Sequence, residues 1–257
     1  MDFMKPETVL DLNNIRQVLQ RMEDTIIFYF IERSQFYTSP SVYKKDVFPI
    51  PNFDGSFLDW LLSQHEKIQS QVRRYQAPDE YPFFPESVQP SFLPKVNYPH
   101  VLASYADEVN INKDVLRVYV DHMVPGISSG SGDQMENFGS TAMADIDALQ
   151  SLSRRIHFGM FVAEAKFRNE TEKFTALIKN KDIKGIDKAI TNTAVEEKIL
   201  KRLLEKAKTY GVDPTLKFTQ HMTKVKPEIV VKIYKDYVIP LTKKVEIDYL
   251  MRRLEDE

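Results

Sequence analysis

The apolar residues near the amino terminus recur every three or four positions, which is the period of an α-helix. The pattern runs from Thr8 to about Arg33 through Val9, Leu12, Ile15, Val18, Leu19, Met22, Ile26 and Phe30. It predicts a long first helix with Thr8 as its N-cap residue. The same period returns after Gly55 and stops near Arg74, before Pro78, which predicts a second helix.

The middle of the chain alternates between helix breakers and periodic segments. Six prolines between Ala77 and Asn110 exclude regular helix there. A helix is predicted from Asn112, followed by a loop over 126–140. From Ser140 to about Arg168 only Gly159 interrupts the period, which predicts a spine helix of about eight turns. Further helices are predicted over 171–180, 183–191 and 194–210, and a last helix begins at Pro227 and is kinked at Pro240.

Together these segments predict an all-α fold, a helical bundle around one long central helix. No extended strand-like alternation occurs, and eight glycines in 257 residues leave little room for β-hairpins. The length suits a single domain over residues 1–257.

Composition narrows the class of protein further. Lys plus Arg number 35 against 37 Asp plus Glu, so the net charge of -2 gives no reason to expect nucleic acid or an anionic membrane as a partner. The longest apolar run, Ile26 to Ile31, is far shorter than the ~20 residues of a membrane span. The absence of cysteine and of a leader-like amino terminus predicts a cytoplasmic protein.

The sequence contains no motif typical of a metal or cofactor site. The histidines lack metal-ligand spacing, and no Gly-rich phosphate loop or nucleophile elbow is present. These histidines are His65, His100, His122, His157 and His221. We therefore expect neither a metal nor a cofactor.

Two cations on the predicted spine helix are candidates for ligand binding. Arg155 and Lys166 are eleven residues apart, so they share one helix face and their Cα atoms stand about 16 Å apart. Gly159 and Val162 lie between them on that face and would form a small, uncharged surface on which a ligand could lie. The competing interpretation is an ordinary solvated cationic face.

Polar groups on other helices favour a binding site. Asn192 with Glu196, and Thr242 with Glu246, are spaced one turn apart amid apolar residues. Arg16 adds a third cation on the first helix, where it needs an anionic partner if it is buried. Three cations and two carboxyls suit a dianionic small molecule.

Several strings, in the correct order along the whole chain, resemble the fungal, yeast-type chorismate mutases. They are Asn14-Ile-Arg16, Gly55-Ser-Phe-Leu-Asp-Trp60, Ser151-Leu-Ser-Arg-Arg-Ile-His-Phe-Gly159, Ala163-Glu-Ala-Lys166, Thr191-Asn-Thr-Ala-Val-Glu-Glu197 and Pro240-Leu-Thr-Lys-Lys-Val-Glu246. The resemblance implies an all-α homodimer that rearranges chorismate to prephenate, an isomerase of aromatic amino acid biosynthesis.

The resemblance also assigns roles to the candidate residues. Arg16 and Arg155 would bind the two carboxylates of chorismate, while Lys166 and a protonated Glu246 would face the ether oxygen. Glu196 would accept the hydrogen bond of the ring hydroxyl, and Asn192 and Thr242 would complete the polar contacts.

A regulatory site is implied between the subunits, where tyrosine inhibits and tryptophan activates. Arg73, Arg74, Asn137, Gly139 and Ser140 match the family's effector-binding residues. In two places the chain departs from the family. Met143 replaces an effector-binding threonine, and Lys226 replaces the threonine before the proline of the last helix. Either both changes are tolerated and regulation is unchanged, or regulation is weakened or switched in its preference between the effectors.

Two other classes of protein compete with this reading. A non-catalytic helical scaffold would have no reason to keep Lys166 and Glu246 together. A bifunctional enzyme with a dehydrogenase or dehydratase step would need a nucleotide-binding domain, for which no residues remain.

Overall fold

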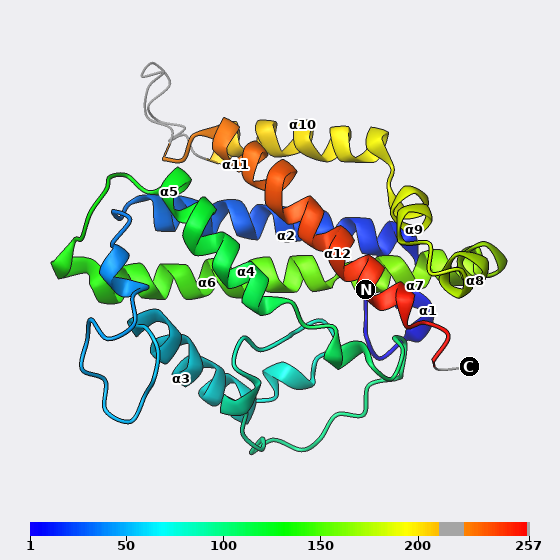
Figure 1. Ribbon diagram of the computed structural model, residues 1–257, viewed down its shortest axis with the longest axis horizontal. Helices are drawn as coiled ribbons and strands as arrows, with labels where there is room; N and C mark the ends of the chain where they lie inside the picture. Colours follow the sequence, from blue (N-terminus) through cyan, green and yellow to red (C-terminus); the bar gives the residue numbers. More distant parts are fainter. Residues whose placement is uncertain (211–223, 256–257) are drawn as a thin grey trace.

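A computed structural model describes residues 1–210 and 224–255, and over these residues the chain is built from helices and irregular connections (Figure 1). The α-helices are α1 (Pro6–Val9), α2 (Leu12–Ser34), α3 (Phe57–Gln71), α4 (Asn112–Val118), α5 (Val124–Ile127), α6 (Phe138–His157), α7 (Gly159–Asn169), α8 (Thr171–Lys179), α9 (Ile183–Ile190), α10 (Thr193–Tyr210), α11 (Pro227–Ile233) and α12 (Ile239–Met251). The β-structure in the described part is one isolated bridge between Tyr37 and Gly130. The all-α prediction is confirmed.

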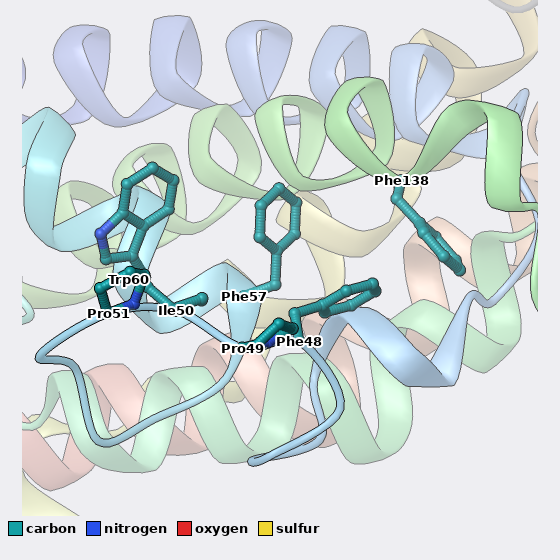
Figure 2. A pocket seen from close by; sticks show the side chains of 7 residues that line it. All are labelled: Phe48, Pro49, Ile50, Pro51, Phe57, Trp60 and Phe138. Carbon is teal, nitrogen blue, oxygen red and sulfur yellow. The ribbon is translucent and has the colours of Figure 1, made fainter.

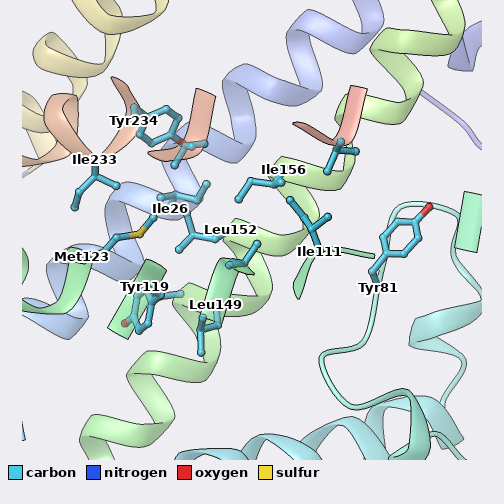
Figure 3. Close-up of a cluster of buried hydrophobic side chains, with 14 of the residues drawn as sticks. Ile26, Tyr81, Ile111, Tyr119, Met123, Leu149, Leu152, Ile156, Ile233 and Tyr234 are labelled. Carbon is cyan, nitrogen blue, oxygen red and sulfur yellow. The ribbon is translucent and has the colours of Figure 1, made fainter. Parts of the chain in front are cut away.

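Helices α2 and α6 lie side by side and run in opposite directions through the middle of the molecule (Figure 1). Their facing side chains are fully buried, among them Ile26 of α2 and Leu149, Leu152 and Ile156 of α6 (Figure 3). Helices α10, α11 and α12 cover one side of this pair, and α3 with the 77–110 connection lies on the other. Burial of this continuous apolar face is the main driving force that fixes the helices relative to one another.

The amino-terminal helix differs from the prediction. A short α1 ends at Val9, and α2 starts separately with Asp11, whose carboxylate accepts hydrogen bonds from the backbone N–H groups of Asn13 and Asn14. Thr8, the predicted N-cap, instead donates its hydroxyl to the carbonyl of Lys5 at 2.9 Å. The apolar period was continuous, but a carboxylate satisfies two free N–H groups and therefore sets the start of the helix.

The predicted spine helix is divided in two. Helix α6 ends at His157, Phe158 forms a turn, and α7 begins at Gly159. The two pieces follow one another along nearly the same line (Figure 1). Because of the break, Arg155 lies on α6 and Lys166 on α7. The start is also earlier than predicted, because α6 begins at Phe138 rather than Ser140.

Pro125 and Pro240 each lie two residues after the last residue of a π-helical segment. Residues Tyr119–Met123 wind as a π-helix before Pro125, and Tyr234–Val238 do so before Pro240. A proline lacks a backbone N–H and crowds the preceding turn, and the wider turn accommodates both changes. The chain around Pro240 therefore departs from regular α-helix just before the proline.

Buried polar groups hold the irregular parts of the chain. The carboxylate of Glu66 accepts hydrogen bonds from the N–H groups of Phe83 and Phe84, which ties the 77–110 connection to α3. His157 is buried, and its Nε2 accepts a hydrogen bond from the N–H of Ile111 at 3.0 Å. Burial lowers the pKa of His157 to about 4, so the ring is neutral at pH 7 and serves the core. His221 lies outside the described residues.

Within the described ranges, no helix has the length and apolar character needed to cross a membrane.

Candidate active site

Four helices bring the candidate catalytic residues together at one end of the molecule. Helices α6 and α7 contribute Arg155 and Lys166, α12 contributes Thr242 and Glu246, and α10 contributes Glu196. Helix α12 packs along both α6 and α7, so its polar face is turned toward the two cations. The side chains meet although they are up to 91 residues apart in sequence, from Arg155 to Glu246.

Arg155 is buried, with 4% of its surface exposed. Its Nη1 lies 3.4 Å from Oγ1 of Thr242, a long and weak contact. Its Nε has no hydrogen-bond partner among the described residues. A buried guanidinium N–H without an acceptor costs about 1–3 kcal/mol, so this group is prepared for an anionic ligand.

Lys166 and Glu246 form an ion pair beside Arg155. Lys166 Nζ lies 3.1 Å from Glu246 Oε2 and also donates to the carbonyl of Ile190, at the end of α9, at 2.6 Å. Burial raises the pKa of Glu246 above that of an ordinary glutamate, although the neighbouring charges of Lys166, Arg155 and Lys243 act in the opposite direction. Burial thus favours the protonated form of this carboxyl, and the three cations oppose it.

Gly159 permits α7 and α12 to approach closely. A Cβ at this position would stand 3.0 Å from Thr242 Cγ2, 3.1 Å from the Thr242 carbonyl oxygen and 3.3 Å from Glu246 Cγ. The sequence suggested a small, uncharged surface between Arg155 and Lys166. The structure instead places Gly159 against the α12 residues that carry the carboxyl and hydroxyl groups.

Gly159→Ala is therefore expected to push α12 outward by a few tenths of an ångström and to lower kcat by about tenfold, because small displacements of reacting groups have large effects. Adding Thr242→Ser removes the nearest methyl group and should restore part of the loss. Gly126→Ala, whose Cβ would meet only Ile229 Cγ2 at 3.3 Å, is the matched control. Steady-state kinetics measure kcat, and equal melting temperatures of the variants would show that folding is intact. An unchanged kcat in Gly159→Ala would contradict the expectation.

The other residues predicted to bind substrate lie nearer the surface than Arg155. Glu196 is half-buried in the first turn of α10, and its Oε1 lies 2.7 Å from Lys243 Nζ. Asn192 is exposed, and its side chain accepts a hydrogen bond from the N–H of Val195, which caps α10. Arg16 is exposed on α2 and donates to Asn13 Oδ1 at 3.2 Å. The expectation of an inward-facing Arg16 is thus not met in this arrangement.

The turn of α2 that carries Arg16 nevertheless packs on the helices of the site. Ile15, next to Arg16, is buried in a small apolar cluster with Phe158 and Phe161, at the junction of α6 and α7. Sequence reasoning missed Lys243, which follows Thr242 directly and is three residues from Glu246. That spacing within one helical turn was the available signal.

The residues predicted to bind an effector form two separate groups. Arg73 and Arg74 follow the end of α3, where Arg74 Nη1 donates to Gln150 Oε1 at 2.8 Å. Asn137, Gly139 and Ser140 lie at the start of α6, ten or more residues before Gln150. At 1.5 Å per residue, Gln150, which Arg74 contacts, lies about 15 Å or more along α6 from Asn137, Gly139 and Ser140, a long span for one amino acid to bridge within a single chain.

An apolar hollow lies close to the start of α6. Phe48, Pro49, Ile50, Pro51, Phe57, Trp60 and Phe138 line it (Figure 2). Its volume is about 280 Å³. The lining side chains include no charged group, so this hollow has none of the chemistry of the Arg155 cluster.

Fold and site together define a class: an all-helical protein in which buried Arg155, half-buried Lys166 and the carboxyl of Glu246 lie side by side, an arrangement that suits a small anionic ligand. Residues 138–247 match the family model described as chorismate mutase type II. The chorismate mutase of Pichia angusta is 72% identical over 258 residues, covering 100% of this chain and 92% of that protein.

Solved structures agree with this match. The Aro7p chorismate mutase of Candida albicans, in complex with L-Trp, superposes with a TM-score of 0.98 at 61% identity, covering 100% of this chain and 97% of that one. AtCM1 with tyrosine bound in its allosteric site gives a TM-score of 0.85 at 39% identity, covering 95% and 96%. The chain belongs to the chorismate mutase family, in its yeast-type branch.

Proposed function

We propose that Arg155, Lys166, Glu246 and their neighbours bind chorismate and rearrange it to prephenate. The observation that carries this proposal is the buried Arg155 guanidinium, whose Nε lacks an acceptor among the described residues, beside the Lys166–Glu246 pair. A carboxylate of the substrate would supply the missing acceptor. Arginine suits this role because its planar fork matches a carboxylate bidentately.

The remaining groups are assigned by what each can donate or accept. Arg16 would bind the second carboxylate after its side chain turns from Asn13 toward the α6–α7 junction. Lys166 and protonated Glu246 would donate to the ether oxygen. Glu196 would accept the hydrogen bond of the ring hydroxyl, and Asn192 and Thr242 would contact the other polar groups.

The rearrangement is intramolecular, so no covalent intermediate is needed. The enzyme has to hold the compact conformer in which the reacting carbons are close, and to stabilise the charge that builds on the ether oxygen as the C–O bond stretches. An ammonium group aimed at that oxygen contributes about 3–4 kcal/mol of transition-state stabilisation. Ionised Glu246 would repel the same oxygen and has no proton to donate.

The direct test is a spectroscopic assay in a mixture without metal or cofactor. Loss of chorismate absorbance with stoichiometric appearance of prephenate is expected for the purified chain. The proposal fails if chorismate persists beside a folded protein, or if it is consumed without forming prephenate.

We also propose that the chain is a homodimer in which each effector site draws on both subunits. Arg73 and Arg74 of one subunit would meet Asn137, Gly139 and Ser140 of the other, because within one chain the Arg74 contact on α6 lies a long span from the start of that helix. A two-fold interface makes two identical sites of this kind. The tryptophan bound by the Candida enzyme and the tyrosine bound in the allosteric site of AtCM1 support aromatic amino acids as effectors. We assign tyrosine as inhibitor and tryptophan as activator from the family resemblance.

Met143 should weaken tyrosine inhibition. It is 41% exposed on α6, one turn after Gly139, and it has no hydroxyl to bond an effector. Met143→Thr is expected to lower the tyrosine concentration for half-inhibition by up to about tenfold, the effect of one hydrogen bond. Exposed Ile183 on α9 offers the control, Ile183→Thr, and complete inhibition of the parent protein that tryptophan reverses would contradict the expectation.

The second departure from the family lies at the start of α11. Lys226 is the N-cap residue of that helix and makes no side-chain capping hydrogen bond there, and Pro227 is the first helical residue as predicted. A threonine in its place could cap the helix with its hydroxyl. We propose that Lys226 leaves this end of α11 less firmly held.

A further inference from the structure

We propose that Lys243 is a positioning residue that fixes the Glu196 carboxylate over the substrate and connects α10 to α12 across the active site. The inference rests on the proposed function, because it concerns the carboxylate expected to accept the ring hydroxyl. Lys243 Nζ lies 2.7 Å from Glu196 Oε1, and the two side chains are 24% and 27% exposed. The pair is thus at the edge of the site and partly shielded from water.

The position of Glu196 needs such a partner. Farther along α10, Arg202 pairs with buried Glu23 of α2 at 2.6 Å, which anchors the middle of the helix. In the part of the chain that the structure describes, the first turn has no comparable anchor: Asn192 is exposed and its side chain is used in capping, and Val195 is 40% exposed. The ion pair with Lys243 is therefore what relates the Glu196 carboxylate to α12.

The adjacent lysine shows how this pair differs from an ordinary surface ion pair. Lys244 pairs with Asp248 on the same helix, four residues on, with side chains 46% and 42% exposed. Solvent-exposed ion pairs of this kind contribute little to the stability of the folded state. Lys243 and Glu196 are 47 residues apart, on two helices, and both lie beside the catalytic cluster. Lys244 is therefore a matched control.

Lys243 also acts on Glu246 through its charge. The charged groups that face Glu246 are Lys166 from α7, Arg155 from α6 and Lys243 from its own helix, with Glu196 of α10 paired to Lys243. Each of the three cations favours the ionised carboxylate and lowers its pKa. Removing Lys243 should therefore raise the pKa of Glu246 and extend its protonated form to higher pH.

The experiment is a kinetic comparison of Lys243→Met with Lys244→Met. Lys243→Met is expected to raise KM for chorismate about tenfold, as when a charged hydrogen bond is lost, and to move the alkaline limb of the activity profile to higher pH. Lys244→Met should retain the KM and profile of the parent. Lys243→Arg keeps the charge and should restore both quantities, which separates the effect from a general loss of folding.

A double variant tests whether Lys243 acts through Glu196. In a Glu196→Gln background, Lys243→Met should change KM by less than about twofold, because residues that act through one interaction are not additive. The same tenfold change in that background would show that Lys243 contacts the substrate itself and would overturn the proposal. Parental KM and pH profile in Lys243→Met would overturn it as well.

These results can be told apart from a failure of the proposed function. If Glu246 does not act as an acid, the pH limb of Lys243→Met stays in place while its effect on KM, and the non-additivity with Glu196→Gln, remain. If chorismate is not the substrate, the parent protein itself shows no turnover.

Discussion

Lys166→Ala is expected to lower kcat for the conversion of chorismate to prephenate by about 10²–10³-fold, the loss seen when a preorganised donor is removed from a developing oxyanion. Lys166 Nζ is held by Glu246 Oε2 and the Ile190 carbonyl, so its charge is fixed before substrate arrives. The deletion removes that charge and leaves Glu246 without its partner. Initial rates at saturating chorismate measure the effect.

Arg155→Ala should act differently, because a carboxylate is bound in both ground and transition states. It should raise KM strongly and lower kcat/KM by about 10²-fold or more, since charged bidentate pairs are among the strongest hydrogen bonds. Lys173→Ala is a suitable control, because Lys173 is exposed on α8 and pairs with exposed Glu170. Near-parental kinetics in both active-site variants, with folding intact, would remove the basis of the proposed mechanism.

Glu246→Gln is expected to abolish the decline of activity with rising pH. Burial raises the pKa of Glu246. In the parent, activity is therefore full below this pKa, where the carboxyl carries its proton, and falls as pH rises through it. Glutamine carries a donor at every pH, so the profile of the variant should remain flat across that range.

The comparison needs kcat and kcat/KM measured across the pH range, with Glu172→Gln as the control. Glu172 is exposed in the first turn of α8, and its amide form should copy the parent profile. If Glu246→Gln itself copies the parent, another group is responsible for the pH dependence and the acid role of Glu246 is wrong.

Much of the helical framework could be predicted from local patterns. The α8, α9 and α10 ranges were predicted to within a few residues, because apolar period, helix propensity and capping all act within a few residues of chain. The break at Phe158 was not predicted, since the apolar period runs through it. The break lies directly before Gly159, which approaches Thr242 and Glu246 of α12, a contact between segments distant in sequence.

The candidate site shows the same division. Residue types and helical spacings identified Arg155, Lys166, Thr242, Glu196 and Glu246, and the resemblance assigned their roles. Their convergence follows from the packing of α12 on α6 and α7. The exposed Arg16, the capping role of Asn192 and the pairing of Lys243 with Glu196 could not be read from periodicity, because periodicity gives a face and not its partner.

The sequence by itself determined the class of fold, the kinds of charged group available and, through several ordered strings, the family. Those features depend on local chain chemistry and on residue identity. Only the tertiary structure decided that Arg155 is buried with an Nε–H that has no acceptor in residues 1–210 and 224–255, that Glu246 lies where burial favours its protonated form, and that the effector residues of one chain stay apart. Burial and distance arise when segments remote in sequence pack together, and no local pattern encodes them.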